Sequence, residues 1–314
     1  MNMNALPILY QDHYLLVVNK PPGLVIHPTY KHANGTMWDQ LLDNLAQQEP
    51  EDWQPVALPD RPEWARAPQA VQKMLRELQR QRYLQEEGLL PRPCLLHRLD
   101  QDTSGVVALA RTERARRHFS RQFQEHRAGK RYLAVVSKGA PAWAKPQAPF
   151  SLTRSMHGQQ TIEDEGRFEW DTRYDVLLDG PLQRDPLDRR RSIVGPGGQS
   201  AQTWIRPLLI GERYTLLEAR PITGRTHQIR AHLAAAGYSI VGDATYGVQD
   251  EHDRIEGGLQ RQFLHAASLE LHRYPDNMLQ KFAAPLADDL ARWLAANFPE
   301  GLDALDARFN IPAK

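Results

Sequence analysis

The 314-residue chain contains only one cysteine, Cys94, and no long run of apolar residues. A single cysteine excludes an intramolecular disulfide and a cysteine-based zinc knuckle, and it is typical of proteins from a reducing compartment. Apolar runs such as residues 106–110 are far shorter than the roughly 18 residues that span a bilayer. Residues 1–4 carry no Lys or Arg and Asp12 interrupts the segment that follows, so we expect a cytoplasmic protein without a secretory signal or membrane contact.

The chain also has no excess of charge of either sign, since its formal net charge is +1. The charges are nevertheless segregated. Residues 111–131 contain eight basic and two acidic residues, whereas residues 43–63 contain six acidic residues and one basic residue. A concentrated basic stretch can bind a polyanion although the whole chain is nearly neutral. It can equally form the solvated face of a helix, and charge alone leaves both interpretations open.

Residues 43–93 differ in composition from their surroundings, because they hold seven of the 23 prolines. Within them, residues 69–87 contain neither Pro nor Gly, and Val71, Leu75 and Leu78 recur at helical spacing. The pattern predicts an irregular acidic loop followed by one amphipathic helix.

The remaining sequence contains many short β-rich runs and a few helical segments. Its patterns predict strands at residues 8–10, 14–19, 24–27, 106–110, 132–136, 202–209, 214–221 and 264–271. They predict helices at 113–126, 226–236 and 286–297, and loops with short strands at 154–173 and 178–200. Because strands outnumber helices and do not alternate with them regularly, we expect an α+β fold with a mainly antiparallel mixed sheet, flanked by helices and loops.

A polar loop at residues 98–105 lies directly before the apolar strand at 106–110. It places Asp100 near Arg98 and ahead of a Thr-Ser-Gly turn. A neighbouring arginine favours the ionised carboxylate that a nucleophile or general base requires, and loops on a sheet often carry such chemistry. A structural turn closed by the aspartate explains the same residues, and composition leaves both interpretations open.

Arg220, Arg225 and Arg230 gather at a predicted strand-to-helix junction. The N-terminus of a helix favours anions, so a phosphate or a buried carboxylate is a plausible partner for these arginines. Exposed surface arginines are the alternative. Histidine spacing does not predict a metal site, because His227 and His232 lie about 140° apart around a helix. We expect structural or hydrogen-bonding roles for these two and for His27, His97 and His265.

Six segments together resemble, in their order along the chain, the motifs of the RluA-type family of pseudouridine synthases. They are residues 19–23 (NKPPG), 97–105 (HRLDQDTSG), 129–132 (GKRY), 184–186 (RDP), 223–232 (TGRTHQIRAH) and 242–247 (GDATYG). The resemblance implies the pseudouridine synthase catalytic fold. It also implies that the protein isomerises uridine to pseudouridine in structured RNA, either ribosomal RNA or tRNA, without a cofactor or a metal.

The resemblance implies roles for individual residues. Asp100 corresponds to the catalytic aspartate, Arg230 to the arginine paired with it and Tyr132 to the aromatic residue that contacts the target base. Arg98 corresponds to an arginine that holds the flipped-out nucleotide, and Ile229 to an apolar contact beneath the base. Such a nucleotide must leave the base stack before its glycosidic bond can be reached, and an aromatic ring can then stack on it.

Further RNA contacts are expected around these residues. Candidate substrate-binding residues are Thr103, Arg225 and His227. Candidate contacts to the RNA backbone are Arg114, Arg117 and Arg121, which are three or four residues apart on a predicted helix, and Lys130 and Arg131 after it. The sequence thus predicts RNA as the partner and indicates no obligate protein partner.

We expect one catalytic domain at residues 1–285, with residues 43–93 as an insertion longer than the family pattern. Residues 286–314 are expected to form a C-terminal helix and tail, and no S4-type RNA-binding domain is expected before the first strands. A catalytically silent RNA-binding protein on the same fold is one alternative, but it would lack the aspartate that Asp100 supplies. A glycoside hydrolase with Asp102 as its second carboxylate is another, and the arginine clusters and the lack of tryptophan near the motif argue against it.

Overall fold

A computed structural model describes residues 6–26, 34–48, 60–156, 159–163, 168–247 and 258–298 of the chain. Its strands are β1 (Ile8–Gln11), β2 (Leu15–Lys20), β3 (Leu89–Leu95), β4 (Ser104–Thr112), β5 (Gly129–Lys138), β6 (Ser151–Met156), β7 (Gln159–Glu163), β8 (Asp175–Asp179), β9 (Leu182–Arg184), β10 (Ser192–Val194), β11 (Gln202–Ile210), β12 (Tyr214–Pro221), β13 (Tyr238–Ile240), β14 (Leu264–His272) and β15 (Leu279–Ala283). Its helices are α1 (Met37–Ala46), α2 (Gln69–Glu87), α3 (Glu113–Gln124), α4 (Gln228–Ala235) and α6 (Asp288–Asn297), with 3₁₀ turns η2 (Pro62–Arg66) and η3 (Ala142–Ala144).

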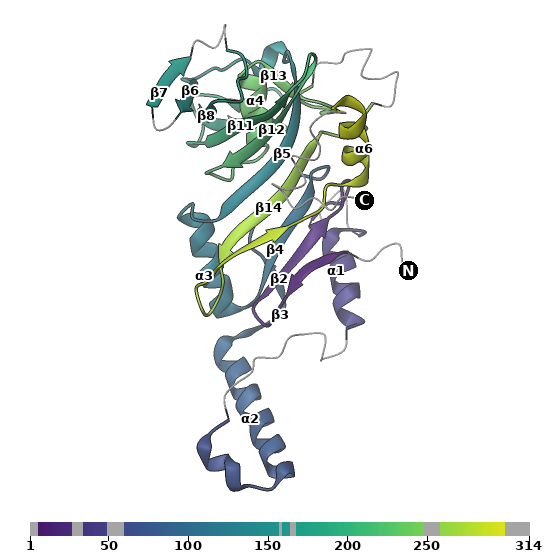
Figure 1. Ribbon diagram of the computed structural model, residues 1–314, viewed down its shortest axis with the longest axis vertical. Coiled ribbons are helices and arrows are strands. Elements are labelled where there is room, and N and C mark those ends of the chain that lie inside the picture. Colours follow the sequence, from purple (N-terminus) through teal and green to yellow (C-terminus); the bar gives the residue numbers. More distant parts are fainter. Residues whose placement is uncertain are drawn as a thin grey trace.

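Within the described residues, one twisted sheet contains most of the strands, in the order β1-β2-β4-β14-β5-β12-β11-β8-β6-β7 (Figure 1). β3 pairs with β4, β13 with β5 and β15 with β14, while β9 and β10 form a separate hairpin. β4 and β14 are parallel, and the other pairings between these strands are antiparallel. The expected α+β fold with a mainly antiparallel mixed sheet is confirmed.

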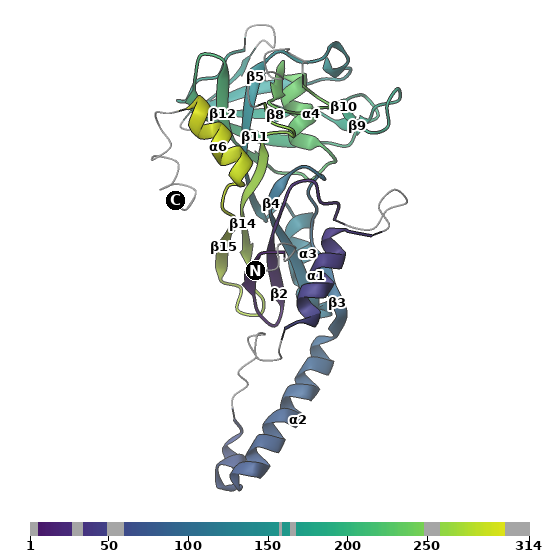
Figure 2. The same ribbon diagram turned by 90° about the vertical axis from the view of Figure 1, so that its right-hand side faces the viewer.

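Helices cover both faces of the sheet, because successive strand residues point to opposite sides. In β2, Leu15 and Val17 pack in the cluster that contains α3, whereas Leu16 and Val18 pack in the cluster that contains α1. Figure 2 shows α4 and α6 on opposite sides of the other half of the sheet. Both helices contribute to the same large core cluster as β5, β11 and β12.

Helix α2 projects away from the end of the sheet (Figures 1 and 2). Its C-terminal end is attached through the buried Glu87, which accepts a hydrogen bond from the Tyr274 hydroxyl at 3.1 Å and pairs with Arg114 at 3.3 Å. The helix has the predicted bounds. The predicted helix is confirmed, but its apolar side is not packed against the core: Val71 and Leu78 are 38% and 54% exposed.

Two other predictions need correction. Residues 24–26 are not a strand, because the carbonyls of Val25 and Ile26 accept hydrogen bonds from the first turn of α1, which the sequence patterns did not indicate. His27 lies outside the described residues, as do residues 49–59 of the acidic loop. Helix α3 ends at Gln124 rather than at residue 126, since His126 has a left-handed backbone with φ of 57°. The short strands β13 and β15 were also not predicted.

Candidate active site

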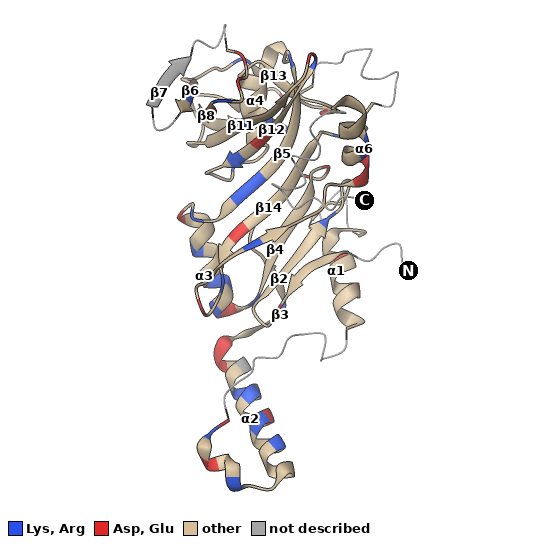
Figure 3. Ribbon diagram, in the orientation of Figure 1, with Lys and Arg blue, Asp and Glu red and all other residues tan. Residues whose placement is uncertain are grey.

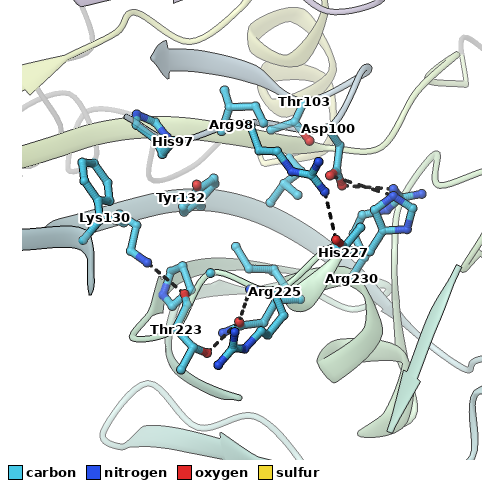
Figure 4. Close-up of a pocket in the computed structure, with 18 of the residues that line it drawn as sticks. His97, Arg98, Asp100, Thr103, Lys130, Tyr132, Thr223, Arg225, His227 and Arg230 are labelled. Atoms are coloured by element: carbon cyan, nitrogen blue, oxygen red, sulfur yellow. Dashed lines mark hydrogen bonds and ion pairs between the residues drawn. The ribbon is translucent and has the colours of Figure 1, made fainter. Parts of the chain in front are cut away.

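A cavity of about 570 Å³ lies where the loop before β4, the end of α3, β5 and the segment between β12 and α4 meet. Figure 4 shows Asp100 and Arg230 on one side of it, His97 and Lys130 on the other, and Tyr132 between them. The structure brings all the expected catalytic and substrate-binding residues to this cavity: Asp100, Arg230, Tyr132, Arg98, Ile229, Thr103, Arg225 and His227.

The charges at Asp100 form a chain that leads into the protein. Arg230 Nη1 donates to Asp100 Oδ2 at 3.1 Å, while its Nε and Nη2 donate to the two oxygens of Asp243 at 2.6 and 2.8 Å. The side chains of Asp100, Arg230 and Asp243 are 24%, 7% and 0% exposed. Although burial opposes its charge, the hydrogen bonds and charge of Asp243, with the charge of Asp100, raise the pKa of Arg230 above its ordinary value. Arg230 is therefore a permanent cation beside Asp100.

Asp243 and Tyr246 fix the orientation of the Arg230 guanidinium. One oxygen of Asp243 also accepts the backbone N–H groups of Thr245 and Tyr246 at 2.9 and 3.0 Å. The guanidinium carbon lies 4.9 Å from the centre of the Tyr246 ring, and the Tyr246 hydroxyl is bound to the backbone of Ser192. A cation held by a two-pronged carboxylate and an aromatic face has little freedom to rotate.

His227 lies on the other side of the Asp100 carboxylate. Its Nε2 is 3.9 Å from Asp100 Oδ1, and its Nδ1 is 3.3 Å from the Tyr246 hydroxyl. The backbone is left-handed, with φ of 54°, so the ring turns into the cavity just before α4 begins. Burial lowers the pKa of His227, and the charge of Asp100 opposes this shift. The neutral ring is therefore favoured at neutral pH.

Tyr132 and Ile229 supply the flat and apolar parts of the cavity wall. Tyr132 comes from β5 and is half-buried, whereas Ile229 is buried in the first turn of α4. Burial, and then the charge of Asp100, raise the pKa of Tyr132, so its phenol remains protonated. An aromatic ring opposite an aliphatic side chain suits a planar base.

The loop that carries Asp100 is held from behind by Lys20, at the end of β2. This lysine is fully buried, and its Nζ donates to the carbonyls of Gln101 and Thr103 at 2.6 and 2.9 Å. Burial lowers the pKa of Lys20 to about 7. Gly105 follows with φ of 115°, and a Cβ there would lie 2.2 Å from the carbonyl oxygen of Ala266. Only glycine allows β4 to approach β14 this closely directly after the loop.

Gln228 organises the segment that precedes α4. Its Oε1 accepts hydrogen bonds from the Thr223 hydroxyl at 2.7 Å and from the Arg225 N–H at 2.9 Å. Its Nε2 donates to the Gln202 carbonyl and to the Thr203 hydroxyl at 2.9 and 3.0 Å. A single buried amide thus ties the segment to β11.

The rim of the cavity is cationic. Arg98 is exposed and donates to the Thr226 hydroxyl at 2.9 Å, which links the Asp100 loop to the α4 segment. Arg225 is also exposed and donates to the Ser200 carbonyl at 3.2 Å. Lys130 donates to the Thr223 carbonyl at 2.8 Å, and burial lowers its pKa to about 8. It therefore remains mostly protonated at neutral pH.

The residues expected to contact the RNA backbone differ in their surroundings. Arg114, Arg117 and Arg121 are exposed on α3, but Arg114 pairs with Glu87 at the base of α2 and Arg117 pairs with Glu113 at 2.9 Å. Glu113 is the acidic residue of α3 and lies at the start of the helix, and Figure 3 shows basic residues along the rest of it.

Lys130 and Arg131 separate because neighbouring residues of a strand point to opposite faces. Lys130 lines the cavity. Arg131 instead lies 3.5 Å from the buried carboxylate of Glu218 and 3.7 Å from that of Glu270. Arg131 therefore does not extend the row of arginines on α3.

The described residues contain no group of three or more His, Cys, Asp or Glu side chains that could hold a metal ion. His232 and His265 have the predicted hydrogen-bonding role: the Nδ1 atoms lie 2.9 Å from the hydroxyls of Thr203 and Ser104. His97 accepts the N–H of Ala108 at 3.1 Å. Within the same part of the chain, no helix is both long and apolar enough to span a membrane.

The family model for RNA pseudouridylate synthase matches residues 14–235, most of the chain and nearly all of the cavity. The chain belongs to this family. The RluA-type resemblance is confirmed by relatives such as the ribosomal large subunit pseudouridine synthase D of Nitrosomonas europaea, which is 30% identical over 294 residues. That match covers 93% of the chain and 65% of the relative.

Another relative, an uncharacterized RNA pseudouridine synthase of Chloroflexus aurantiacus, is 35% identical over 272 residues, covering 87% of the chain and 63% of the relative. The chain thus spans somewhat less than two thirds of the length of both relatives. Human RNA pseudouridylate synthase domain containing 1 has the same fold, with a TM-score of 0.53 at 21% identity. That comparison covers 100% of this chain and 98% of the human one.

Four residues of the site received no role from the sequence: Lys20, Gln228, Asp243 and Tyr246. All four lie within the six motif segments, so the motifs were the signal that could have identified them. Their functions depend on partners far away in the chain, such as the carbonyl of Gln101 for Lys20. The motifs thus identify these four residues, but only their contacts in the structure show what each of them does.

Proposed function

We propose that this chain is an RNA pseudouridine synthase that isomerises uridines in structured RNA, with Asp100 as the catalytic residue. One observation carries the proposal: Asp100 is the only carboxylate among the residues that line the cavity, and Arg230 and Tyr132 lie beside it there. An ionised carboxylate, an oriented cation and an aromatic ring form a site for chemistry at a nucleotide.

The reaction breaks the bond between C1′ and N1 of uridine and forms a bond between C1′ and C5 of the same base. The proton of C5 is lost and N1 gains one, so the product is an isomer. Asp100, which accepts a hydrogen bond from Arg230, can stabilise positive charge at C1′ or accept the proton of C2′. Both roles need the carboxylate to reach the ribose while the base remains bound.

Tyr132 and Ile229 would hold the detached base while it turns. The nucleotide must first leave its stack, and Arg98, exposed at the rim beside Asp100, would help to hold the flipped-out nucleotide. Arg98, Lys130, Arg225 and Arg230 give the cavity four cations against one carboxylate, which favours a polyanion. We expect the phosphates that flank the target to bind at the exposed Arg98 and Arg225.

The names of the relatives favour large-subunit ribosomal RNA as the substrate, with tRNA as the other candidate. A catalytically silent RNA-binding protein would not need Asp100 to be held by Arg230 and Asp243. A glycoside hydrolase would need a second carboxylate at the cavity, and Asp102 is not among the lining residues. Both alternatives are therefore disfavoured by the same cavity.

The test is incubation of the protein with unmodified large-subunit ribosomal RNA and with tRNA transcripts. Tritium release from RNA labelled at C5 of uridine measures the reaction, and reverse-transcription mapping of pseudouridine locates the site. We expect release from at least one RNA and none with Asp100→Asn. RNA binding without release by the wild-type protein would support the silent binder instead.

A further inference from the structure

The backbone of the Asp100 loop presents three consecutive carbonyls to buried cations. Lys20 Nζ donates hydrogen bonds to the first and the third of them, the carbonyls of Gln101 and Thr103. The middle carbonyl, that of Asp102, accepts from Arg261 Nη1 at 3.0 Å. Arg261 Nη2 also donates to the hydroxyl of Ser104 at 3.3 Å. Lys20 and Arg261, neither of which lines the cavity, thus hold the backbone of the loop by hydrogen bonds.

Arg261 is held in turn by the C-terminal helix. Its Nε and Nη2 donate to the two oxygens of Asp289 at 2.7 and 2.9 Å. Asp289 lies in the first turn of α6, where the helix dipole favours a carboxylate. Leu290 and Leu294 of the same helix are buried in the large core cluster, so the position of Asp289 is fixed by packing.

Arg261 and Asp289 lie outside both the cavity and the family match. Arg261 is 7% exposed, and neither residue lines the cavity. The family model ends at residue 235, and the sequence patterns set residues 286–314 apart from the catalytic domain. No role in the reaction therefore follows for either residue from the motifs.

We propose that Arg261 is a positioning residue for Asp100, and that α6 sets its place through Asp289. The inference rests on the proposed function, since it concerns the rate at which Asp100 acts. Without Arg261 the partly buried carbonyl of Asp102 loses its hydrogen-bond donor, which is costly. The loop relieves this cost by moving, which shifts Asp100 relative to Arg230 and the substrate.

Such a shift affects turnover more than binding, because Arg261 does not touch the cavity. For Arg261→Met we expect kcat to fall by about 10- to 100-fold, the range that a displacement of about 1 Å can cause. KM should stay within about twofold of the wild-type value, since the contacts to RNA are unchanged. Arg261→Lys should recover part of the loss, because one amine can reach one of the two partners but cannot bridge both.

The experiment compares Arg261→Met, Arg261→Lys and Asp289→Asn with Arg292→Met, which removes an exposed arginine from α6. Rates are measured on the RNA identified by mapping and divided by the folded fraction from circular dichroism. Asp289→Asn keeps the shape of the carboxylate, so it provides the answer if Arg261→Met fails to fold. We expect Asp289→Asn to lower kcat several-fold and Arg292→Met to leave it unchanged.

Two outcomes overturn the inference. One is a wild-type kcat per folded molecule for Arg261→Met or Asp289→Asn despite a lower melting temperature, which would give the pair a purely structural role. The other is a rise in KM with kcat unchanged, which would place the pair in RNA binding. Activity of Asp100→Asn would instead refute the proposed function. Arg261 would then have no catalytic residue to position.

Discussion

The Asp100 loop and the helix α3 both carry paired charges, yet their pairs differ in kind. Around Asp100, Arg230 and Asp243 are buried and joined by hydrogen bonds of 2.6 to 3.1 Å. On α3, Arg114 and Arg117 are 57% and 74% exposed. Buried pairs impose one geometry because the alternative is an unpaired charge in a dry interior. Exposed pairs contribute little stability and leave their charge available to a partner.

The comparison separates two roles that charged residues have in this protein. The buried chain behind Asp100 can orient a reacting group, whereas α3 can contribute only attraction that salt screens. Changes in the buried chain should therefore act on turnover and folding. Changes on α3 should act on affinity.

The largest effect is expected for Asp100→Asn, which keeps the shape of the side chain and removes its charge. We expect pseudouridine formation to fall by at least about 10³-fold, because neither charge stabilisation nor proton transfer remains. RNA affinity and the urea midpoint should change little, as Asp100 is partly exposed. Tritium release measures the rate, and residual activity within tenfold of the wild type would remove Asp100 from the catalytic role.

Arg230→Ala tests the next link of the buried chain. It leaves the fully buried Asp243 without its cation, so we expect a loss of activity of about 100-fold together with reduced stability. Arg230→Lys should rescue both in part, since lysine cannot form the two-pronged contact with Asp243. Activity per folded molecule and the urea midpoint are measured for each variant. Equal activities of Arg230→Lys and the wild type would show that charge alone suffices.

Reversal of charge on α3 tests the exposed side. In the double variant Arg117→Glu and Arg121→Glu, RNA affinity should fall and its salt slope should decrease by about one unit per lost phosphate contact. Turnover at saturating RNA should be unchanged. Arg114→Glu is examined separately, because it would place a like charge beside the buried Glu87 and loosen the base of α2. An unchanged salt slope in the double variant would show that Arg117 and Arg121 are solvated surface residues that do not contact RNA.

The smallest effect concerns the response of stability to pH. Burial lowers the pKa of His232 and of His265 to about 4, against about 6.5 in an unfolded chain. Between these values the unfolded state binds more protons, so stability falls as the pH drops from about 6.5 to 4. Urea midpoints across this range should show it. His232→Asn should flatten the curve.

Local patterns predicted most elements because neighbours in sequence decide them. The helix α2 has its predicted bounds, and α3 begins after Thr112, whose side chain accepts the Ala115 N–H as a cap. The strand predicted at 24–27 failed, because the carbonyls of Val25 and Ile26 are taken by α1 rather than by a strand. The exposed apolar side of α2 shows the same limit, since periodicity identifies a face but not what covers it.

The sequence by itself determined the fold class, the family and the residue types of the site, because motif order and β-rich patterning are properties of the chain. Only the tertiary structure decided which of these residues meet. Asp100 and Arg230 are 130 positions apart and come together because β4, which follows Asp100, and β12, which precedes α4, lie in one sheet, separated by β14 and β5. The hydrogen bonds from Lys20 and Arg261 to the Asp100 loop likewise join residues that are far apart in the chain. Such contacts depend on how the whole core packs, which no local spacing encodes.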